Sequence, residues 1–205
     1  MINFPKNLSD FLKKEELNLE KKIAKGFSSE VFLVKKEKKF FALKIEKLKS
    51  RREEMAEREV ENLKKANLIG VGPKLFVFDL KKRIILMEFI KGKTFSKWLF
   101  GLKKNEKNKK ILKKFIKELI LQAEKMDENG LDHGQLAGRG VNILVSRNKP
   151  VIIDFEKAST KRKCHNKTVL DSFLFKNPYS EITKKVREIL EWTSETNKKI
   201  QNNTL

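Results

Sequence analysis

The 205-residue sequence contains a single cysteine, Cys164. One cysteine cannot form an intramolecular disulfide, and it cannot build a cysteine-rich zinc site, so both kinds of cross-link are excluded. A lone cysteine also fits a reducing cytoplasm. The first residues contain no apolar signal-peptide core, and no apolar run approaches the length of a membrane span. These absences predict a soluble cytoplasmic protein.

Acidic residues are scarce relative to basic ones. The sequence has 27 Asp and Glu against 48 Lys and Arg, which gives a formal net charge of +21. A solvated Lys/Glu-rich surface, common in heat-adapted proteins, accounts for the high charge content but not for the imbalance. The excess favours anionic partners such as RNA, DNA or nucleotide phosphates. Basic clusters at 103–117 and 161–167 are candidates for tracking phosphates, although solvated faces are the commoner role of lysine runs.

Apolar residues make up 39% of the sequence, enough for the core of one large domain or of two small lobes. Hydrophobic periodicity predicts a group of strands with one helix, followed by a mostly helical half. A turn at Lys149-Pro150 is expected to separate the last two strands. The predicted helices lie at 7–17 (with Ser9 as N-cap), 51–66, 94–101, 111–129, 168–176 and 180–198. The predicted strands lie at 19–25, 31–34, 40–45, 75–78, 84–89, 142–145 and 151–154.

Two charged residues in the first half share a face with small or apolar neighbours. In the strand at 40–45, alternation places Phe40, Ala42 and Lys44 on one face, beside the loop that contains Gly26. In the helix at 51–66, Glu59 lies on the edge of an apolar stripe. Each pattern alone is more often a solvated side chain on a half-exposed element, so neither defines a site without a partner.

Polar residues concentrate between positions 132 and 156. The run DHGQL at 132–136 precedes two short apolar runs, and the second of these ends in Asp154. An acid, an amide and a His/Gln pair on short strands suggest a metal–phosphate site more than a packing solution. The candidate residues are Asp132, Gln135, Asn142 and Asp154. This pattern is only moderately specific, so the motifs that precede it decide its interpretation.

Taken in order, the motifs resemble those of protein kinases, in particular the atypical RIO-like and KEOPS-kinase-like small kinases. FALK at 41–44 resembles the V-A-I-K strand, MEFIKG at 87–92 resembles the hinge, and DFE at 154–156 replaces D-F-G. The stretch DHGQL followed by IIDFEKAS is similar to a small group of predicted archaeal Ser/Thr protein kinase-like proteins. The resemblance covers roughly residues 19–160.

This resemblance implies an α+β, bilobal protein-kinase-like fold. Residues 1–18 would form an N-terminal helical extension, and residues 19–91 an N-lobe of antiparallel sheet plus one helix. Residues 92–205 would form a reduced, mostly helical C-lobe.

The resemblance also implies a site for ATP and Mg²⁺. A glycine-poor loop with two serines would face the phosphates, the lysine would reach the α/β-phosphates, and the helix glutamate would pair with that lysine. Glu57 and Glu61 rival Glu59 for this role by position alone. Hinge backbone groups would bind adenine. The implied nucleotide-binding residues are Gly26, Ser28, Ser29, Val31, Ala42, Lys44, Glu59, Glu88 and Ile90, and the implied metal ligands are Asn142 and Asp154.

The catalytic loop departs from the family pattern. Related kinases read His-Gly-Asp-Leu with an asparagine five residues after the aspartate, whereas here Gln135 takes the base position and Asn142 follows seven residues later. A glutamine amide does not ionise at neutral pH, but it can orient a nucleophile or a water. Asp132 is the nearest spare carboxylate and the first alternative base. The implied catalytic residues are therefore Lys44, Asp132 and Gln135.

The implied function is an ATP-dependent Ser/Thr protein kinase that transfers the γ-phosphate of Mg-ATP to a protein hydroxyl, on another protein or on itself. Two alternatives stay open. One is an ATPase-type switch, and the other is a pseudokinase scaffold, either of which would bind RNA or a ribonucleoprotein through the basic surface. The retained Lys44, Glu59, Asn142 and Asp154 argue against a pure scaffold, while Gln135 argues against a conventional kinase.

Overall fold

The computed structural model describes residues 8–47 and 54–192. The chain divides into two compact units, each considered separately below. The first unit comprises Met1–Lys91 with Ile153–Thr160, and the second comprises Gly92–Ile152 with Lys161–Leu205. The segment 153–160 thus groups with the first ninety residues. The division into an extension and two lobes at residues 18 and 91 stays a prediction.

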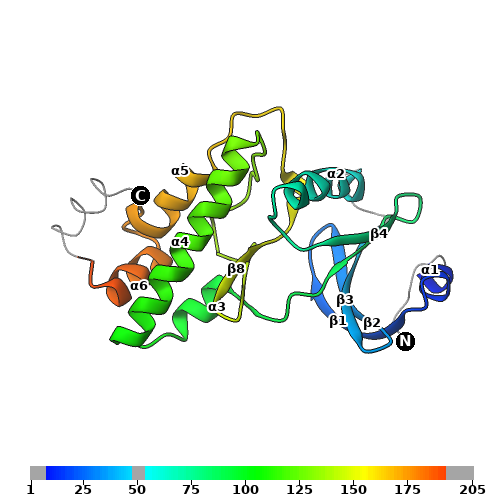
Figure 1. Cartoon of the computed structure of the whole chain (residues 1–205), viewed down its shortest axis with the longest axis horizontal. Coiled ribbons are helices and arrows are strands. Elements are labelled where there is room, and N and C mark those ends of the chain that lie inside the picture. Colours follow the sequence, from blue (N-terminus) through cyan, green and yellow to red (C-terminus); the bar gives the residue numbers. More distant parts are fainter. Residues whose placement is uncertain (1–7, 48–53, 193–205) are drawn as a thin grey trace. The chain divides into compact units, whose positions relative to one another are not determined.

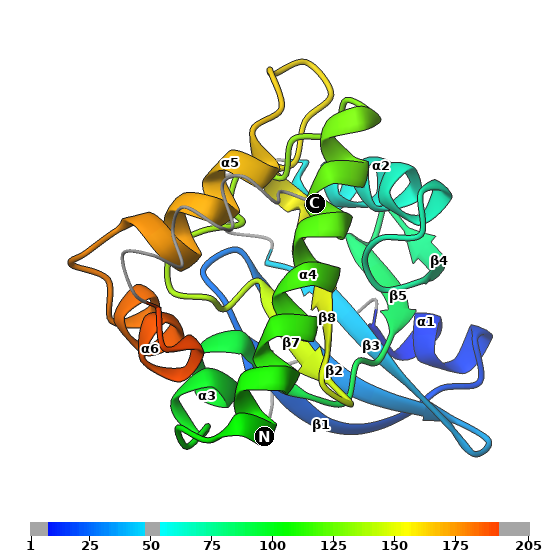
Figure 2. The ribbon, with the colours of Figure 1, turned by 60° about the vertical axis from the view of Figure 1, so that its left-hand side comes forward.

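A five-stranded antiparallel sheet forms the frame of the first unit. Its order is β1-β2-β3-β5-β4, and Figure 2 shows β1, β2 and β3 as neighbouring strands. Short turns join the first three strands into a meander, as the sequence predicts. The strands are β1 (Asn18–Lys25), β2 (Ser29–Lys36), β3 (Lys39–Glu46), β4 (Leu75–Asp79) and β5 (Ile84–Glu88).

The two faces of this sheet have different partners. One face packs against α1 (Leu8–Lys14), whose Leu8 and Phe11 are buried in a cluster with Phe32, Leu43 and other apolar strand residues. Alternation turns Lys44 to the other face, where α2 (Met55–Leu68) lies. The predicted alternation is confirmed. The predicted N-cap was wrong, because α1 already includes Leu8 and Ser9 lies inside it.

The start of α2 is fixed by the end of β3. Glu46, the last residue of β3, accepts a hydrogen bond at Oε2 from the Ala56 backbone N–H at 2.9 Å. A carboxylate at a helix N-terminus satisfies an otherwise unpaired donor and complements the helix dipole. Arg83 contacts the same carboxylate at 3.4 Å. This contact fixes the first turn of α2 against the end of β3. The next turn of α2 carries Glu59. The first residues of the predicted helix at 51–66 lie outside the described ranges.

The loop between α2 and β4 requires a glycine at position 72. Gly72 has φ +81°, and a Cβ there would lie 2.8 Å from Cε2 of Phe155 and 3.1 Å from Cδ1 of Leu63. Gly70, two residues earlier, has φ +73° but has no heavy atom within 4 Å of the same position. Both glycines use the left-handed region, but only Gly72 is also closely packed.

Gly72→Ala is therefore expected to destabilise the chain by about 1–3 kcal/mol more than Gly70→Ala, since only the first adds overpacking to the left-handed backbone cost. Urea unfolding of both variants measures this difference. Equal losses in the two variants would show that Phe155 moves aside without cost.

The second unit packs helices against a small three-stranded sheet of order β6-β7-β8. Phe95 stacks on Phe115 with ring centroids 5.3 Å apart, and this aromatic pair lies in the core of the second unit. The helix α4 contacts both α5 and α6 (Figure 1). The helices are α3 (Phe95–Phe100), α4 (Glu106–Glu128), α5 (Asn166–Asp171), the π-helical turn η2 (Ser172–Lys176) and α6 (Glu181–Leu190); the strands are β6 (Lys93–Thr94), β7 (Ile143–Ser146) and β8 (Lys149–Ile152).

Two local predictions in this unit were wrong. The hairpin turn lies at Arg147 and Asn148, with φ 50° and 61°, because a two-residue hairpin of this hand needs two left-handed residues. Pro150 instead lies within the edge strand β8, where its missing N–H costs no ladder bond. The last helix ends at Leu190 because Glu191 turns left-handed at φ 53°. Residues 193–198 of the predicted helix lie outside the described residues.

The predicted α+β class is confirmed, with an antiparallel sheet in the first part of the chain and mostly helices after it. Within residues 8–47 and 54–192, none of the helices is both long enough and apolar enough to cross a membrane.

Candidate active site

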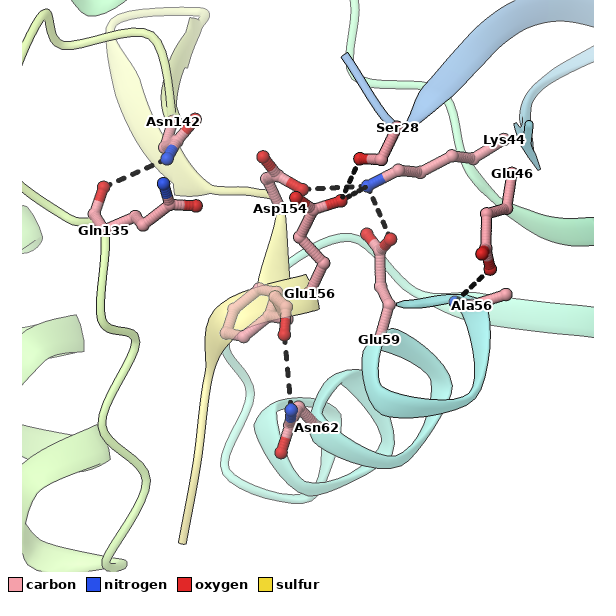
Figure 3. Close-up of polar contacts among 11 residues, drawn as sticks. Ser28, Lys44, Glu46, Ala56, Glu59, Asn62, Gln135, Asn142, Asp154 and Glu156 are labelled. Atoms are coloured by element: carbon pink, nitrogen blue, oxygen red, sulfur yellow. Dashed lines mark hydrogen bonds and ion pairs between the residues drawn. The ribbon is translucent and has the colours of Figure 1, made fainter. Parts of the chain in front are cut away.

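Lys44 lies at the centre of a cluster of acids in the first unit. Its Nζ is 2.5 Å from Oε2 of Glu59, 2.8 Å from Oδ1 of Asp154 and 3.5 Å from Oε2 of Glu156 (Figure 3). Burial by itself lowers the pKa of Lys44, but the carboxylates of Glu59, Asp154 and Glu156 outweigh it and raise this pKa well above its usual value. Lys44 therefore stays charged at any physiological pH.

Glu59 is the helix acid that pairs with Lys44. Its rivals Glu57 and Glu61 are exposed, whereas Glu59 is buried. Burial raises the pKa of Glu59 to about 7, and the negative charges of Asp154 and Glu156 raise it as well. The positive charge of Lys44 acts in the opposite direction but does not cancel this rise. A single ammonium thus faces carboxylates of three residues that lie within 4.8 Å of one another. The cluster carries excess negative charge, which a bound cation would compensate.

The raised pKa of Glu59 makes folding stability depend on pH. Between pH 4.5 and about 7 the folded chain holds a proton on Glu59 that the unfolded chain releases, so the contribution of Glu59 to stability is greatest below 4.5 and is lost as pH rises through 7. In metal-free buffer, Glu59→Gln is expected to remove this decline, which is on the order of 3 kcal/mol. Urea unfolding at pH 5 and pH 8 measures it, with the exposed Glu61→Gln as control. Parallel pH profiles in all three proteins would contradict this assignment.

The turn that carries Asp154 is anchored to α2. Asp154 has a left-handed backbone, φ 69° and ψ 67°, and the 3₁₀ turn η1 (Phe155–Lys157) follows it. The buried Asn62 of α2 donates hydrogen bonds to the carbonyl oxygens of Phe155 at 3.3 Å and Ala158 at 2.8 Å. Non-glycine residues in such conformations are costly and cluster at functional sites. The helix that supplies Glu59 therefore also holds the turn that presents Asp154.

The predicted phosphate loop is the turn between β1 and β2. The N–H of Gly26 donates to the carbonyl of Ser29 at 2.8 Å, and Nζ of Lys47 donates to the Gly26 carbonyl at 2.6 Å. Ser28 and Ser29 are both buried, and Ser28 donates its hydroxyl to Oε2 of Glu156 at 3.2 Å. Val31 lies directly across the strand pair from Lys44. One of the two serine hydroxyls assigned to phosphate thus already has an acidic partner.

The predicted adenine-binding residues lie on β3 and at the end of β5. Ala42 lies on β3 two residues before Lys44, and therefore on the same face of the sheet. The N–H of Glu88 donates to the Lys74 carbonyl at 2.8 Å, so this N–H is not available to a base. Ile90 follows β5 and lies outside the strand.

The predicted catalytic loop lies in the second unit. Asn142 donates from Nδ2 to the Gln135 carbonyl at 3.0 Å, which fixes the amide and leaves its Oδ1 as an oxygen ligand of the kind Mg²⁺ prefers. The fully buried Asn166 holds the start of the loop, because it accepts from the His133 N–H at 2.9 Å and donates to the Leu131 carbonyl at 2.8 Å. The loop geometry therefore depends on α5.

Asp132 is not a free carboxylate. Its Oδ2 lies 2.9 Å from Nη2 of Arg162. Both residues line a hollow of about 390 Å³, which is within the size range of ligand pockets. The side chains of Gln135, Leu136, Lys163 and His165 line it as well.

Sequence reasoning missed the residues that support the site. Glu156 is the most important of them, since it contacts both Lys44 and Ser28. Its one sequence signal is the departure from D-F-G at the third position. Asn62 and Asn166 sit in helices as ordinary polar residues, and no local pattern marks them.

A lysine on a central antiparallel strand, paired with a helix glutamate and with an aspartate on a following turn, defines a protein-kinase-like fold. The chain belongs to the RIO domain family, since the family profile matches residues 16–172. The predicted membership of an atypical, RIO-like kinase family is confirmed.

Individual relatives agree with this assignment. The chain is 30% identical over 112 residues to the EKC/KEOPS complex subunit bud32 of Dictyostelium discoideum, and 33% identical over 105 residues to the KEOPS complex subunit Bud32 of Pyrococcus abyssi. These alignments cover 54% and 51% of the chain, and 44% of each relative, so the chain matches less than half of their length. It is also 32% identical over 104 residues, 51% of the chain, to an uncharacterised protein of Methanocaldococcus jannaschii, of which 83% is covered.

Proposed function

We propose that the chain is an ATP-dependent phosphotransferase that moves the γ-phosphate of Mg-ATP to a Ser/Thr hydroxyl of a protein. The observation that carries this proposal is the contact of Lys44 with both Glu59 and Asp154, at 2.5 and 2.8 Å. A lysine held in this way is a fixed positive charge for nucleotide phosphates, and the acid beside it is a ligand for their metal. Membership of the RIO domain family supports the same chemistry.

The residues present fit a magnesium ion. In the first unit, the acid cluster has more negative charge than Lys44 neutralises, and its candidate ligand Asp154 offers carboxylate oxygens. In the second unit, Asn142 offers an amide oxygen. When bound, Mg²⁺ neutralises charge on the phosphates and on the transferred group. Lys44 binds and orients the phosphates, and Glu59 holds Lys44 in place. The ligand roles of Asp154 and Asn142 are part of this proposal.

The hollow beside Gln135 is the proposed acceptor site. Phosphoryl transfer passes through a loose transition state, so positioning the hydroxyl contributes more than abstracting its proton early. Gln135 positions the hydroxyl through its amide. Asp132 accepts the proton only if Arg162 releases it, because the two are ion-paired at 2.9 Å. Transfer without a free base should therefore be slow.

Gln135 also favours a second candidate, an ATPase-type switch. A glutamine amide can orient water for hydrolysis, as it does in some GTPases. Two relatives are named KEOPS complex subunits, which supports a switch that works within a protein assembly. The net charge of +21 supports RNA or a ribonucleoprotein as a partner. If the chain does not bind RNA at low salt, or if its affinity for RNA does not change with salt, RNA is excluded as a partner.

One experiment tests both candidates. The chain is incubated with Mg²⁺ and γ-labelled ATP, alone and with a generic protein acceptor, and label in protein and free phosphate are followed together. Transfer to protein supports the kinase, and phosphate release alone supports the ATPase. Bound nucleotide with neither product supports a scaffold. If ATP does not bind at all, the proposed function is wrong.

A further inference from the structure

We propose that Glu156 is a built-in competitor of the nucleotide phosphates. In the nucleotide-free chain its carboxylate contacts Lys44 and Ser28, and a phosphate must displace it from both residues. This inference rests on the proposed ATP binding and adds to it a residue that sets nucleotide affinity.

Three acids compete with a phosphate for the Lys44 ammonium. A lysine ammonium has three N–H donors, and here three acids face it, Glu59 at 2.5 Å, Asp154 at 2.8 Å and Glu156 at 3.5 Å. A phosphate oxygen that approaches Lys44 therefore meets the negative charge of these acids. The longest of the three contacts is that of Glu156.

Glu156 also contacts the predicted phosphate loop. The hydroxyl of Ser28 donates to Oε2 of Glu156 at 3.2 Å, and the same oxygen faces Lys44 (Figure 3). Ser28 has a relative exposure of 5%, so its hydroxyl has little access to water as an alternative partner. One carboxylate oxygen thus contacts two groups that the kinase resemblance assigns to the phosphates.

The positions of the other two acids make Glu156 the one to be displaced. The Glu59 side chain is 4% exposed and held on α2. Asp154 carries the proposed metal-ligand role. Glu156 lies on the three-residue turn η1, and a carboxylate and a phosphate placed on the same donors repel each other. Kinases with the D-F-G motif have a glycine here and therefore no side chain that competes.

The test compares nucleotide affinity in variants of equal charge. Glu156→Gln removes the competing charge, while Glu61→Gln makes the same change in net charge at an exposed residue that is not among the acids paired with Lys44. Titration calorimetry with ATP is run in EDTA and in Mg²⁺. We expect the dissociation constant in EDTA to fall about tenfold in Glu156→Gln and to change by less than about twofold in Glu61→Gln. The gain in Mg²⁺ should have the same sign and be smaller, since the cation offsets part of the repulsion.

A second variant keeps the test valid if the amide disturbs the turn. Glu156→Asp retains the charge but shortens the side chain by one methylene, which draws it back from Lys44, and an intermediate gain is expected. Unchanged affinity in both variants would overturn the inference while leaving the proposed function intact. Weaker binding in Mg²⁺ would also overturn it, because Glu156 would then be a metal ligand. If neither the wild-type chain nor any variant binds ATP, both proposals fail.

Discussion

Lys44→Met is expected to cost the folded chain about 3–5 kcal/mol at pH 8, because it leaves buried carboxylates without their cation. Glu59 and Glu156 are both less than one-tenth exposed, and Asp154 lies against the same ammonium. Methionine fills a similar volume, so the loss comes from charge and not from a cavity. Urea unfolding measures it, with Lys39→Met, an exposed lysine on the same strand, as control.

The loss should shrink as pH falls. Even beside Lys44, burial raises the pKa of Glu59 to about 7, and removing the lysine raises this pKa further. Glu59 becomes protonated at a higher pH in the variant than in the wild-type chain, where its pKa is about 7, so the deficit narrows as pH falls from 8 towards 7. Below 7 both chains gain stability in parallel, and the deficit stays at its smaller value. A deficit at pH 8 that persists unchanged at pH 5 would show that the lysine acts through packing alone.

The elements of the site were predictable because their signals are local. Strand alternation places Lys44 on the face that α2 covers, and helical spacing places Glu59 on the edge of a buried stripe. The order of the motifs then indicated that these two residues are partners. The geometry agrees, since Glu57 and Glu61 are exposed, whereas the buried Glu59 contacts Lys44.

The remaining contacts join residues that are far apart in sequence, and no local pattern encodes them. Ser28 and Glu156 are 128 positions apart, and Asn62 reaches a carbonyl 96 positions away. Each of these residue types is usually solvated, so composition gives no reason to pair them. The ion pair of Asp132 with Arg162 is hidden in the same way, within a stretch that reads as a solvated basic loop. Pairings of this kind follow from the packed fold and not from spacing.

Asp154→Asn is expected to lower Mg²⁺-dependent turnover of ATP by roughly 10²–10³-fold, because metal stabilisation of phosphoryl transfer is worth several kcal/mol. The substitution removes the negative charge without changing the size of the side chain. Asparagine has the same shape and tolerates the left-handed backbone that Asp154 adopts at φ 69°, so the turn η1 should keep its conformation. It also removes one acid from a cluster with excess negative charge, so stability should not fall.

The measurement separates the metal role from a role in folding. Turnover and ATP affinity are followed at increasing Mg²⁺ in the wild-type chain, in Asp154→Asn and in Asp10→Asn, which removes an exposed acid of α1 in the same unit. The active-site variant should lose most of the gain that Mg²⁺ gives to ATP binding, while its unfolding curve stays close to that of the control. If Asp154→Asn keeps the Mg²⁺ response, the metal is held by other ligands, and Asp154 serves mainly as an ion-pair partner of Lys44.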